Sequence, residues 1–234
     1  MADNEIPEEV RSRLALAIDV DDVVAAGRLG KAMAPYFGVA KVGLELFAAA
    51  GPDSIGTMID LGYKVFLDLK LHDIPNTVQR SARVLGALGV SYLTFHAHGG
   101  VDMLKGGVDG LQQGAANAGL ESPQSLAITV LTSDDTAPDH IVPARVAVAL
   151  EAGCTGVVCA VSDLREVHHY APRMIRVTPG IRLADGPRHD QARAASPGEA
   201  IAGGSDLLVV GRAVTEADEP EAAAEQLVAE ILGA

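Results

Sequence analysis

A short segment near residue 70 combines an apolar run with charged side chains whose spacing could support proton transfer. In KVFLDLKLHDIPNTV (residues 64–78), Asp68 and Lys70 are two positions apart, and Asp73 follows on the same segment. Side chains two apart on a strand share a face, so Asp68 and Lys70 should project together while Asp73 lies on the loop beyond. A lysine between carboxylates is favoured in its charged form, which makes Lys70 a candidate proton donor rather than a neutral Schiff-base amine. The alternative is an ion-pair plug with a structural role.

Polar side chains also stand at or near the ends of other apolar runs. They are Asp19, Lys41, His96, Thr132 and Arg212. Several have an ordinary structural explanation, because Asp19 could cap a helix, Lys41 could form an interior ion pair and His96 could be a satisfied structural histidine. His96 and His98 in HAHGG lack a third ligand at metal-binding spacing, so no metal site is predicted.

Two glycine–arginine segments late in the chain could bind a phosphate. TPGIR supplies Gly180 and Arg182, and VVGRAVT supplies Gly211 and Arg212. Glycine permits close approach of backbone N–H groups, and arginine supplies charge. The polar stretch 182–196 follows the first segment and could be a plain surface loop. We predict instead that it is a lid that closes over the bound anion.

The elements that must position these residues alternate between apolar strands and Ala- and Leu-rich helices. Strand-like runs occur at 14–19, 39–43, 64–69, 91–96, 125–131, 155–160, 173–178 and 206–210. Helix-like segments include 22–34, 52–61, 77–88, 101–117, 143–152 and 220–232. Such alternation predicts parallel strands with right-handed crossovers, and eight units in this length fit an α/β fold of the closed (β/α)8 TIM-barrel type. An open doubly wound sheet is the alternative, although AIDVDD replaces a dinucleotide-binding glycine motif after the first strand.

Composition limits the class of protein and its partners. The 234 residues are 48% hydrophobic and carry a net charge of -13. We expect one domain over 1–234, with 1–12 as a loose N-terminal extension. The acidic balance argues against nucleic acid as a partner, and no apolar run approaches the length of a membrane span, so we expect a cytoplasmic protein that binds no membrane. Cys154 and Cys159 are expected to be plain buried thiols, and no cofactor motif is visible.

The segment FLDLKLHDIPNTV resembles the signature of the orotidine 5′-phosphate decarboxylase family, and the resemblance extends from LALAIDV to VVGRAVT. It implies a cofactor-free and metal-free decarboxylase of orotidine 5′-phosphate in pyrimidine biosynthesis. Lys70 is then the proton donor to C6 of the pyrimidine and Asp68 lies by the departing carboxylate. Asp73 reaches into the site of the other subunit of a homodimer, and Lys41 completes an alternating lysine–aspartate network.

The same resemblance assigns substrate contacts to further residues. Asp19 and Thr77 match positions around the ribose, and Thr132 matches a contact near the pyrimidine. The phosphate-binding positions are matched by Arg182, Gln191, Gly211 and Arg212. The D-x-K-x-x-D core also resembles Mg²⁺-dependent sugar-phosphate decarboxylases and aldolases of the same superfamily, but IPNTV, Lys41 and the spacing from Arg182 to Gln191 favour the nucleotide enzyme. A non-catalytic nucleotide-binding barrel is the remaining alternative.

Overall fold

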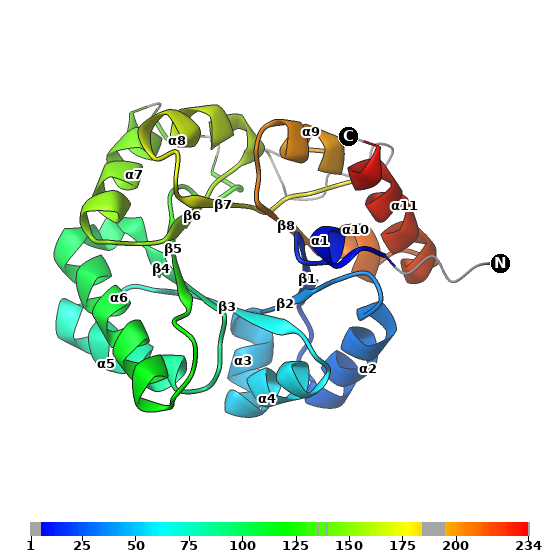
Figure 1. Ribbon diagram of the computed structural model, residues 1–234, viewed down its shortest axis with the longest axis horizontal. Coiled ribbons are helices and arrows are strands. Elements are labelled where there is room, and N and C mark those ends of the chain that lie inside the picture. Colours follow the sequence, from blue (N-terminus) through cyan, green and yellow to red (C-terminus); the bar gives the residue numbers. More distant parts are fainter. Residues whose placement is uncertain (1–5, 135, 139, 184–194, 234) are drawn as a thin grey trace.

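The chain forms a closed barrel of eight parallel strands surrounded by helices (Figure 1). The computed structural model describes residues 6–134, 136–138, 140–183 and 195–233. The strands are β1 (Leu14–Ile18), β2 (Val39–Val42), β3 (Lys64–Leu71), β4 (Tyr92–His96), β5 (Gln124–Ile128), β6 (Gly156–Val158), β7 (Ile175–Thr178) and β8 (Leu207–Val210). Each strand pairs with the next, and β8 pairs with β1. The predicted (β/α)8 barrel is therefore confirmed, and the open sheet is excluded.

The predicted helical segments are all present, with ends within two residues of their expected positions. They are α2 (Val23–Met33), α4 (Pro52–Asp60), α5 (Pro75–Gly86), α6 (Gly100–Asn117), α7 (Ile141–Glu151) and α11 (Pro220–Leu232). The shorter helices are α1 (Glu8–Arg11), α3 (Leu44–Ala50), α8 (Leu164–Tyr170), α9 (Pro197–Ala202) and α10 (Arg212–Thr215), with the 3-10 turns η1 (Ala97–Gly99) and η2 (Val161–Asp163). These short elements have too few residues to show a helical period in the sequence.

Part of the expected N-terminal extension is packed on the barrel. Val10 of α1 is buried, and the Arg11 guanidinium donates a hydrogen bond to the Ala34 carbonyl oxygen at 2.9 Å. The expectation of a loose segment over 1–12 therefore does not describe α1. Residues 1–5 lie outside the described part of the chain.

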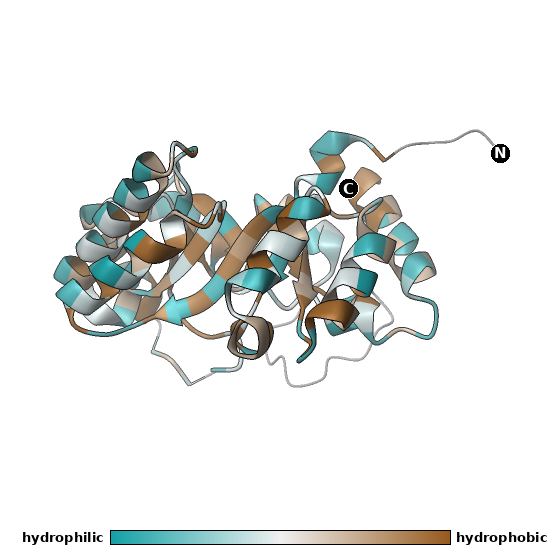
Figure 2. Cartoon of the chain, turned by 90° about the horizontal axis from the view of Figure 1, so that it is seen from below, coloured by the Kyte–Doolittle hydropathy of each residue, from teal (hydrophilic) through white to brown (hydrophobic). Residues whose placement is uncertain are grey.

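The barrel has one apolar core inside the ring of strands and another between the strands and the helices. Side chains such as Ala17, Phe66 and Val177 fill the inner core, whereas Leu16, Leu67 and many helix residues form the outer one. Figure 2 shows the strands mainly in brown, with flanking helices that mix brown and teal residues. Burial on both faces explains why these strands are near-continuous apolar runs. Cys154 and Cys159 are buried free thiols, as predicted, and burial raises the pKa of the Cys154 thiol to about 12.

Helices α5 and α6 pack unusually closely because glycines of α6 face the backbone of α5. A Cβ atom at Gly106 would lie 3.0 Å from the Pro75 carbonyl oxygen. At Gly110 and Gly114 a Cβ atom would overlap the carbonyl oxygens of Gln79 and Arg83. Glycine at these three positions therefore fixes the place of α5, which begins directly after the loop that carries Asp73.

Candidate active site

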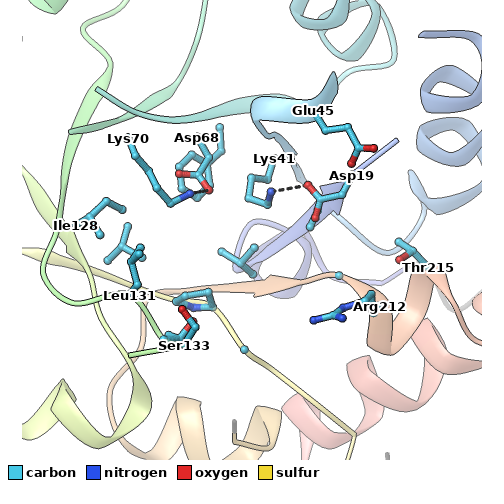
Figure 3. A pocket seen from close by; sticks show the side chains of 18 of the residues that line it. Asp19, Lys41, Glu45, Asp68, Lys70, Ile128, Leu131, Ser133, Arg212 and Thr215 are labelled. Carbon is cyan, nitrogen blue, oxygen red and sulfur yellow. Dashed lines mark hydrogen bonds and ion pairs between the residues drawn. The ribbon is translucent and has the colours of Figure 1, made fainter. Parts of the chain in front are cut away.

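A cavity of about 720 Å³ opens among the carboxyl ends of the strands, where active sites of this fold lie. Its polar lining comes from many strands. The charged and hydroxyl side chains are Asp19, Lys41, Glu45, Asp68, Lys70, Thr132, Ser133, Arg182, Arg212, Thr215 and Glu216. Figure 3 shows two ion pairs on one side of this cavity and Arg212 across from them. The structure thus brings together most of the residues that the sequence singled out.

Lys70 and Asp68 form the first ion pair, with Lys70 Nζ 2.8 Å from Asp68 Oδ2. The backbone of Lys70 has a φ of 51°, and Lys70 is the only non-glycine residue with positive φ in the described ranges. This left-handed conformation costs about 1–3 kcal/mol for such a residue. Strand β3 extends through Lys70 to Leu71, two residues beyond the predicted end, and its register against β4 shifts there. The candidate proton donor therefore occupies a strained position held by its surroundings.

Thr94 of β4 connects the backbone of Lys70 to the carboxylate of Asp68. The Lys70 backbone N–H donates to Thr94 Oγ1 at 2.9 Å, and the Thr94 hydroxyl donates to Asp68 Oδ1 at 2.9 Å. Thr94 is completely buried. The sequence analysis missed this residue. Its only signal was a hydroxyl side chain inside the otherwise apolar run that ends at His96.

Lys41 and Asp19 form the second ion pair at 2.9 Å. Lys41 is buried inside the barrel mouth, whereas Asp19 is exposed to the cavity. A Cβ atom at Gly43 would lie 2.9 Å from Asp19 Oδ1 and 3.1 Å from Lys41 Nζ, so glycine leaves room for the pair. The cap of α2 is Asp22, which accepts a hydrogen bond from the Ala25 N–H at 2.7 Å. Asp19 is therefore not the helix cap that its sequence position also allowed.

Within one chain the two ion pairs are separate, so the alternating network that the family resemblance implied, with Asp73 supplied by the other subunit, stays a prediction. Among the described residues Lys41 makes its ion pair with Asp19, and no ion pair joins Lys41 to Asp68 or Lys70 to Asp73. The Asp73 carboxylate instead accepts a hydrogen bond from the Ile74 N–H at 2.6 Å. Lys41 lies between the two aspartates in Figure 3, so a bound substrate could contact both pairs.

The opposite side of the cavity carries concentrated positive charge. Arg182 is 7% exposed, and its Nε has no hydrogen-bond partner among the residues that the structure describes. Burial, and then the positive charge of Arg212, lower the pKa of Arg182, while Glu216 acts in the opposite direction. Gly180 and Gly211 line the same region. A phosphate bound here would offset the repulsion between two guanidinium groups and satisfy a buried donor.

Two of the predicted residues do not line this cavity, and a third is not described. Asp73 and Thr77 are exposed, and neither belongs to the residues that line it. Gln191 and most of the predicted lid, 182–196, lie outside the described residues. Thr132 does line the cavity, as its position after β5 suggested.

Three histidines, His72, His96 and His98, lie close together near Lys70. The ring of His72 lies 5.7 Å from that of His96 and 5.6 Å from that of His98. Burial, followed by the positive charges of His72, Arg145, His98 and Lys70, lowers the pKa of His96. Across the described ranges, no group of three His, Cys, Asp or Glu side chains is arranged to hold a metal ion.

A closed barrel that gathers acid–base groups and an arginine pair at the carboxyl ends of its strands defines a class, the (β/α)8 enzymes that act on small phosphorylated molecules. Within that class, residues 12–227 match the family model described as "Orotidine 5'-phosphate decarboxylase / HUMPS family". The chain therefore belongs to this family, which confirms the resemblance read from the sequence.

Individual relatives agree with the family model. A protein of Anaeromyxobacter sp. (strain K) named orotidine 5'-phosphate decarboxylase is 42% identical over 93% of this chain and 97% of its own length. A protein of the same name from Moorella thermoacetica is 40% identical over 94% of this chain and 92% of its own length. The crystal structure of orotidine 5'-phosphate decarboxylase from Lactobacillus acidophilus superposes with a TM-score of 0.77 at 36% identity, covering 94% of this chain and 99% of that one.

Proposed function

We propose that this protein converts orotidine 5′-phosphate to UMP and CO₂ in pyrimidine biosynthesis. The observation that carries the proposal is the Asp68–Lys70 ion pair, which faces a cavity whose far side holds Arg182 and Arg212. An ammonium group and two guanidinium groups therefore line the same cavity. A phosphorylated substrate that loses a carboxylate needs such groups for its phosphate and for the carbon that is left behind. Membership of the family supports the same reaction.

Lys70 serves as the proton donor in this proposal. Cleavage of the bond between C6 and the carboxylate leaves an electron pair on C6 as CO₂ departs. The Lys70 ammonium group offsets this developing charge and then transfers its proton to C6, giving UMP and a neutral amine that regains a proton from solvent. Asp68 lies beside the departing carboxylate and holds the ammonium group in place.

Substrate binding divides between the two sides of the cavity. Asp19 contacts the ribose, Lys41 is a further substrate-binding residue beside it, and Thr132 contacts the pyrimidine. Arg182, Gly211 and Arg212 bind the phosphate, together with Gln191 on the proposed lid. Because the phosphate lies far from C6, its binding energy can order the lid and the reacting groups rather than only tighten the complex.

We further propose a homodimer in which Asp73 and Thr77 complete the site of the partner subunit. Both side chains are exposed and lie outside the cavity of their own chain. Ile74, between them, is 65% exposed. These residues follow the end of β3 on the loop and first turn before and within α5, where side chains can reach beyond their own barrel.

The test is the fall in ultraviolet absorbance when orotidine 5′-phosphate loses its carboxylate. Purified protein should produce this change, and it should continue after EDTA treatment and removal of divalent metals. Activity that disappears with EDTA and returns with Mg²⁺ would favour the alternative, a metal-dependent sugar-phosphate decarboxylase or aldolase. Tight binding of UMP with no absorbance change would indicate a non-catalytic nucleotide-binding barrel.

We place the reaction in the cytoplasm, consistent with a small phosphorylated substrate. No helix in the described part of the chain is both long enough and apolar enough to cross a membrane. The net charge of -13 also gives no support for binding to nucleic acid or anionic lipid. Fractionation of cells that express a tagged chain would check this placement.

A further inference from the structure

The buried hydroxyl of Thr94 contacts both members of the Lys70–Asp68 pair. It accepts a hydrogen bond from the Lys70 backbone N–H and donates one to Asp68 Oδ1, each at 2.9 Å. Asp68 Oδ2 in turn binds Lys70 Nζ at 2.8 Å. These three bonds form a closed circuit that runs from the backbone of Lys70 through Thr94 and Asp68 to the side chain of the same lysine.

This circuit lies where the regular pairing of β3 with β4 is interrupted. Leu67 pairs with Leu93 and Leu71 pairs with Phe95, so three residues of β3 face one residue of β4 between these pairs. The single residue on β4 is Thr94. A backbone N–H that has no acceptor on the neighbouring strand needs one elsewhere. The Thr94 hydroxyl accepts the hydrogen bond from the Lys70 N–H. The positive φ of 51° at Lys70 falls within the same interruption.

We propose that Thr94 is a positioning residue for decarboxylation, because its hydroxyl holds both the left-handed backbone of Lys70 and the Asp68 carboxylate. This inference rests on the proposed function. Thr94 does not itself line the cavity. It acts on the reaction by fixing the direction in which the Lys70 ammonium group points toward C6.

Loss of the hydroxyl should affect the chemical step rather than binding. Without it the partly buried Lys70 N–H loses its acceptor and Asp68 loses one of its two bonds, so Lys70 can relax toward an ordinary strand conformation. A displacement of about 1 Å at a reacting group can lower a rate by about 10²-fold. The arginines at the phosphate end are not part of the circuit, so affinity for the nucleotide should remain.

The test compares Thr94→Val, which keeps the shape and removes the hydroxyl, with Thr94→Ser, which keeps the hydroxyl. Thr155→Val is the matched control, since the Thr155 hydroxyl also accepts a hydrogen bond from a backbone N–H, that of Ser125 at 2.9 Å, and Thr155 precedes β6 and does not line the cavity. We expect kcat to fall about 10²-fold in Thr94→Val, with KM and the Kd for UMP nearly unchanged. Thr94→Ser should restore most of kcat, and Thr155→Val should retain wild-type kcat.

Three results would overturn the positioning role. They are wild-type kcat in Thr94→Val, an equal loss in Thr94→Val and Thr155→Val, or a Thr94→Ser variant as inactive as Thr94→Val. If Thr94→Val does not fold by circular dichroism, Thr94→Ala removes the same hydroxyl with less bulk and is judged by the same criteria. A wild-type protein with no decarboxylase activity is a different result, because it refutes the proposed function itself.

Discussion

The two lysines of the cavity differ in their freedom to reach a substrate. Each lysine is paired with an aspartate, but the Lys41 side chain is 11% exposed, whereas the Lys70 side chain is 32% exposed. A proton donor must approach the reacting carbon, while a binding group can remain fixed. The difference in exposure therefore supports Lys70 as the donor and Lys41 as a substrate-binding residue.

Replacement of Lys70 should abolish turnover without unfolding the protein. General acids contribute roughly 10²–10⁴-fold, and a group that also stabilises the carbanion should exceed this range. We therefore expect kcat of Lys70→Ala to fall by more than about 10⁴-fold in the absorbance assay, with a normal circular dichroism spectrum. The exposed helix residue Lys105 provides a control, since Lys105→Ala should be fully active. A Lys70→Ala protein with about a tenth of wild-type turnover would show that another group donates the proton.

Replacement of Arg212 should discriminate between substrates with and without a phosphate. A hydrogen bond to a charged group contributes about 1.5–3 kcal/mol, so Arg212→Ala should lower kcat/KM for orotidine 5′-phosphate roughly 10–100-fold. Orotidine lacks the phosphate and should be affected much less. Measurement of kcat/KM for both substrates checks this, and equal losses would remove Arg212 from the phosphate site.

His96 should make the folded state sensitive to mild acid. Burial and neighbouring positive charges lower its pKa, so the folded protein holds His96 neutral where the unfolded chain, with a pKa near 6.5, already binds a proton. The unfolded state then binds more protons, and stability is lost as the pH falls from about 7 through 6.5 toward the lower pKa of the folded state. In His96→Gln this contribution is absent, so the free energy of unfolding should depend less on pH.

Urea denaturation at several values between about pH 5 and 7 measures this difference. His169 is exposed on α8, and His169→Gln serves as the control that should keep the wild-type dependence. An unchanged pH dependence in His96→Gln would show that His96 has the same pKa in the folded and unfolded protein.

At the scale of the elements, the close packing of α5 against α6 determines where the loop that carries Asp73 lies. Helix α5 starts at Pro75, immediately after Asp73 and Ile74, and its backbone rests against the glycines of α6. Any increase in the separation of the two helices would move the start of α5 and the loop before it. The glycines of α6 therefore matter for the direction of Asp73 as well as for stability.

Gly110→Ala should destabilise the protein although alanine favours helices. In an open helical position the change gains up to about 1 kcal/mol, but here the new Cβ atom meets the Gln79 carbonyl oxygen and overpacking costs about 1–3 kcal/mol or more. We expect a lower Tm for Gly110→Ala. Gly56 of α4 has no neighbouring atom within 4 Å of such a Cβ, so Gly56→Ala should raise Tm slightly. Equal Tm changes for both variants would contradict close packing of α5 on α6.

The sequence predicted the barrel because its strands are buried on both faces and so appear as apolar runs. It also identified most of the charged residues that line the cavity, since strand ends converge in a closed barrel. It could not predict the partner of Lys41, which depends on the pairing of Ala17 with Lys41 across β1 and β2. The backbone of Lys70 and the contact with Thr94 depend on the shifted register of β3 against β4, which leaves no local pattern in the sequence.

At the scale of the whole molecule, we proposed that each active site is shared between two subunits. This proposal predicts that two inactive variants can restore each other's activity. If Lys70 comes from one chain and Asp73 from its partner, a mixed dimer of Lys70→Ala and Asp73→Asn has one site with both defects and one with neither. Random pairing makes about half of the dimers mixed, so refolding the two chains together should recover about a quarter of wild-type activity. Each variant refolded alone should be nearly inactive.

Differently tagged chains allow the mixed dimers to be isolated before the assay. If Asp73 served its own chain, every site in a mixed dimer would carry one defect. Purified mixed dimers that are as inactive as their parents would therefore rule out a site shared between subunits.

The pairing of β1 with β8 has a consequence for synthesis of the chain. Leu14 pairs with Leu208, so the first strand cannot find its second neighbour until β8, the last strand of the barrel, has left the ribosome. Until then the growing sheet has an unpaired edge at β1 and another at its newest strand, which are surfaces that invite aggregation. A chain truncated before β8 would keep both edges permanently. Newly made chains should therefore depend on chaperones most strongly in the period before β8 emerges from the ribosome.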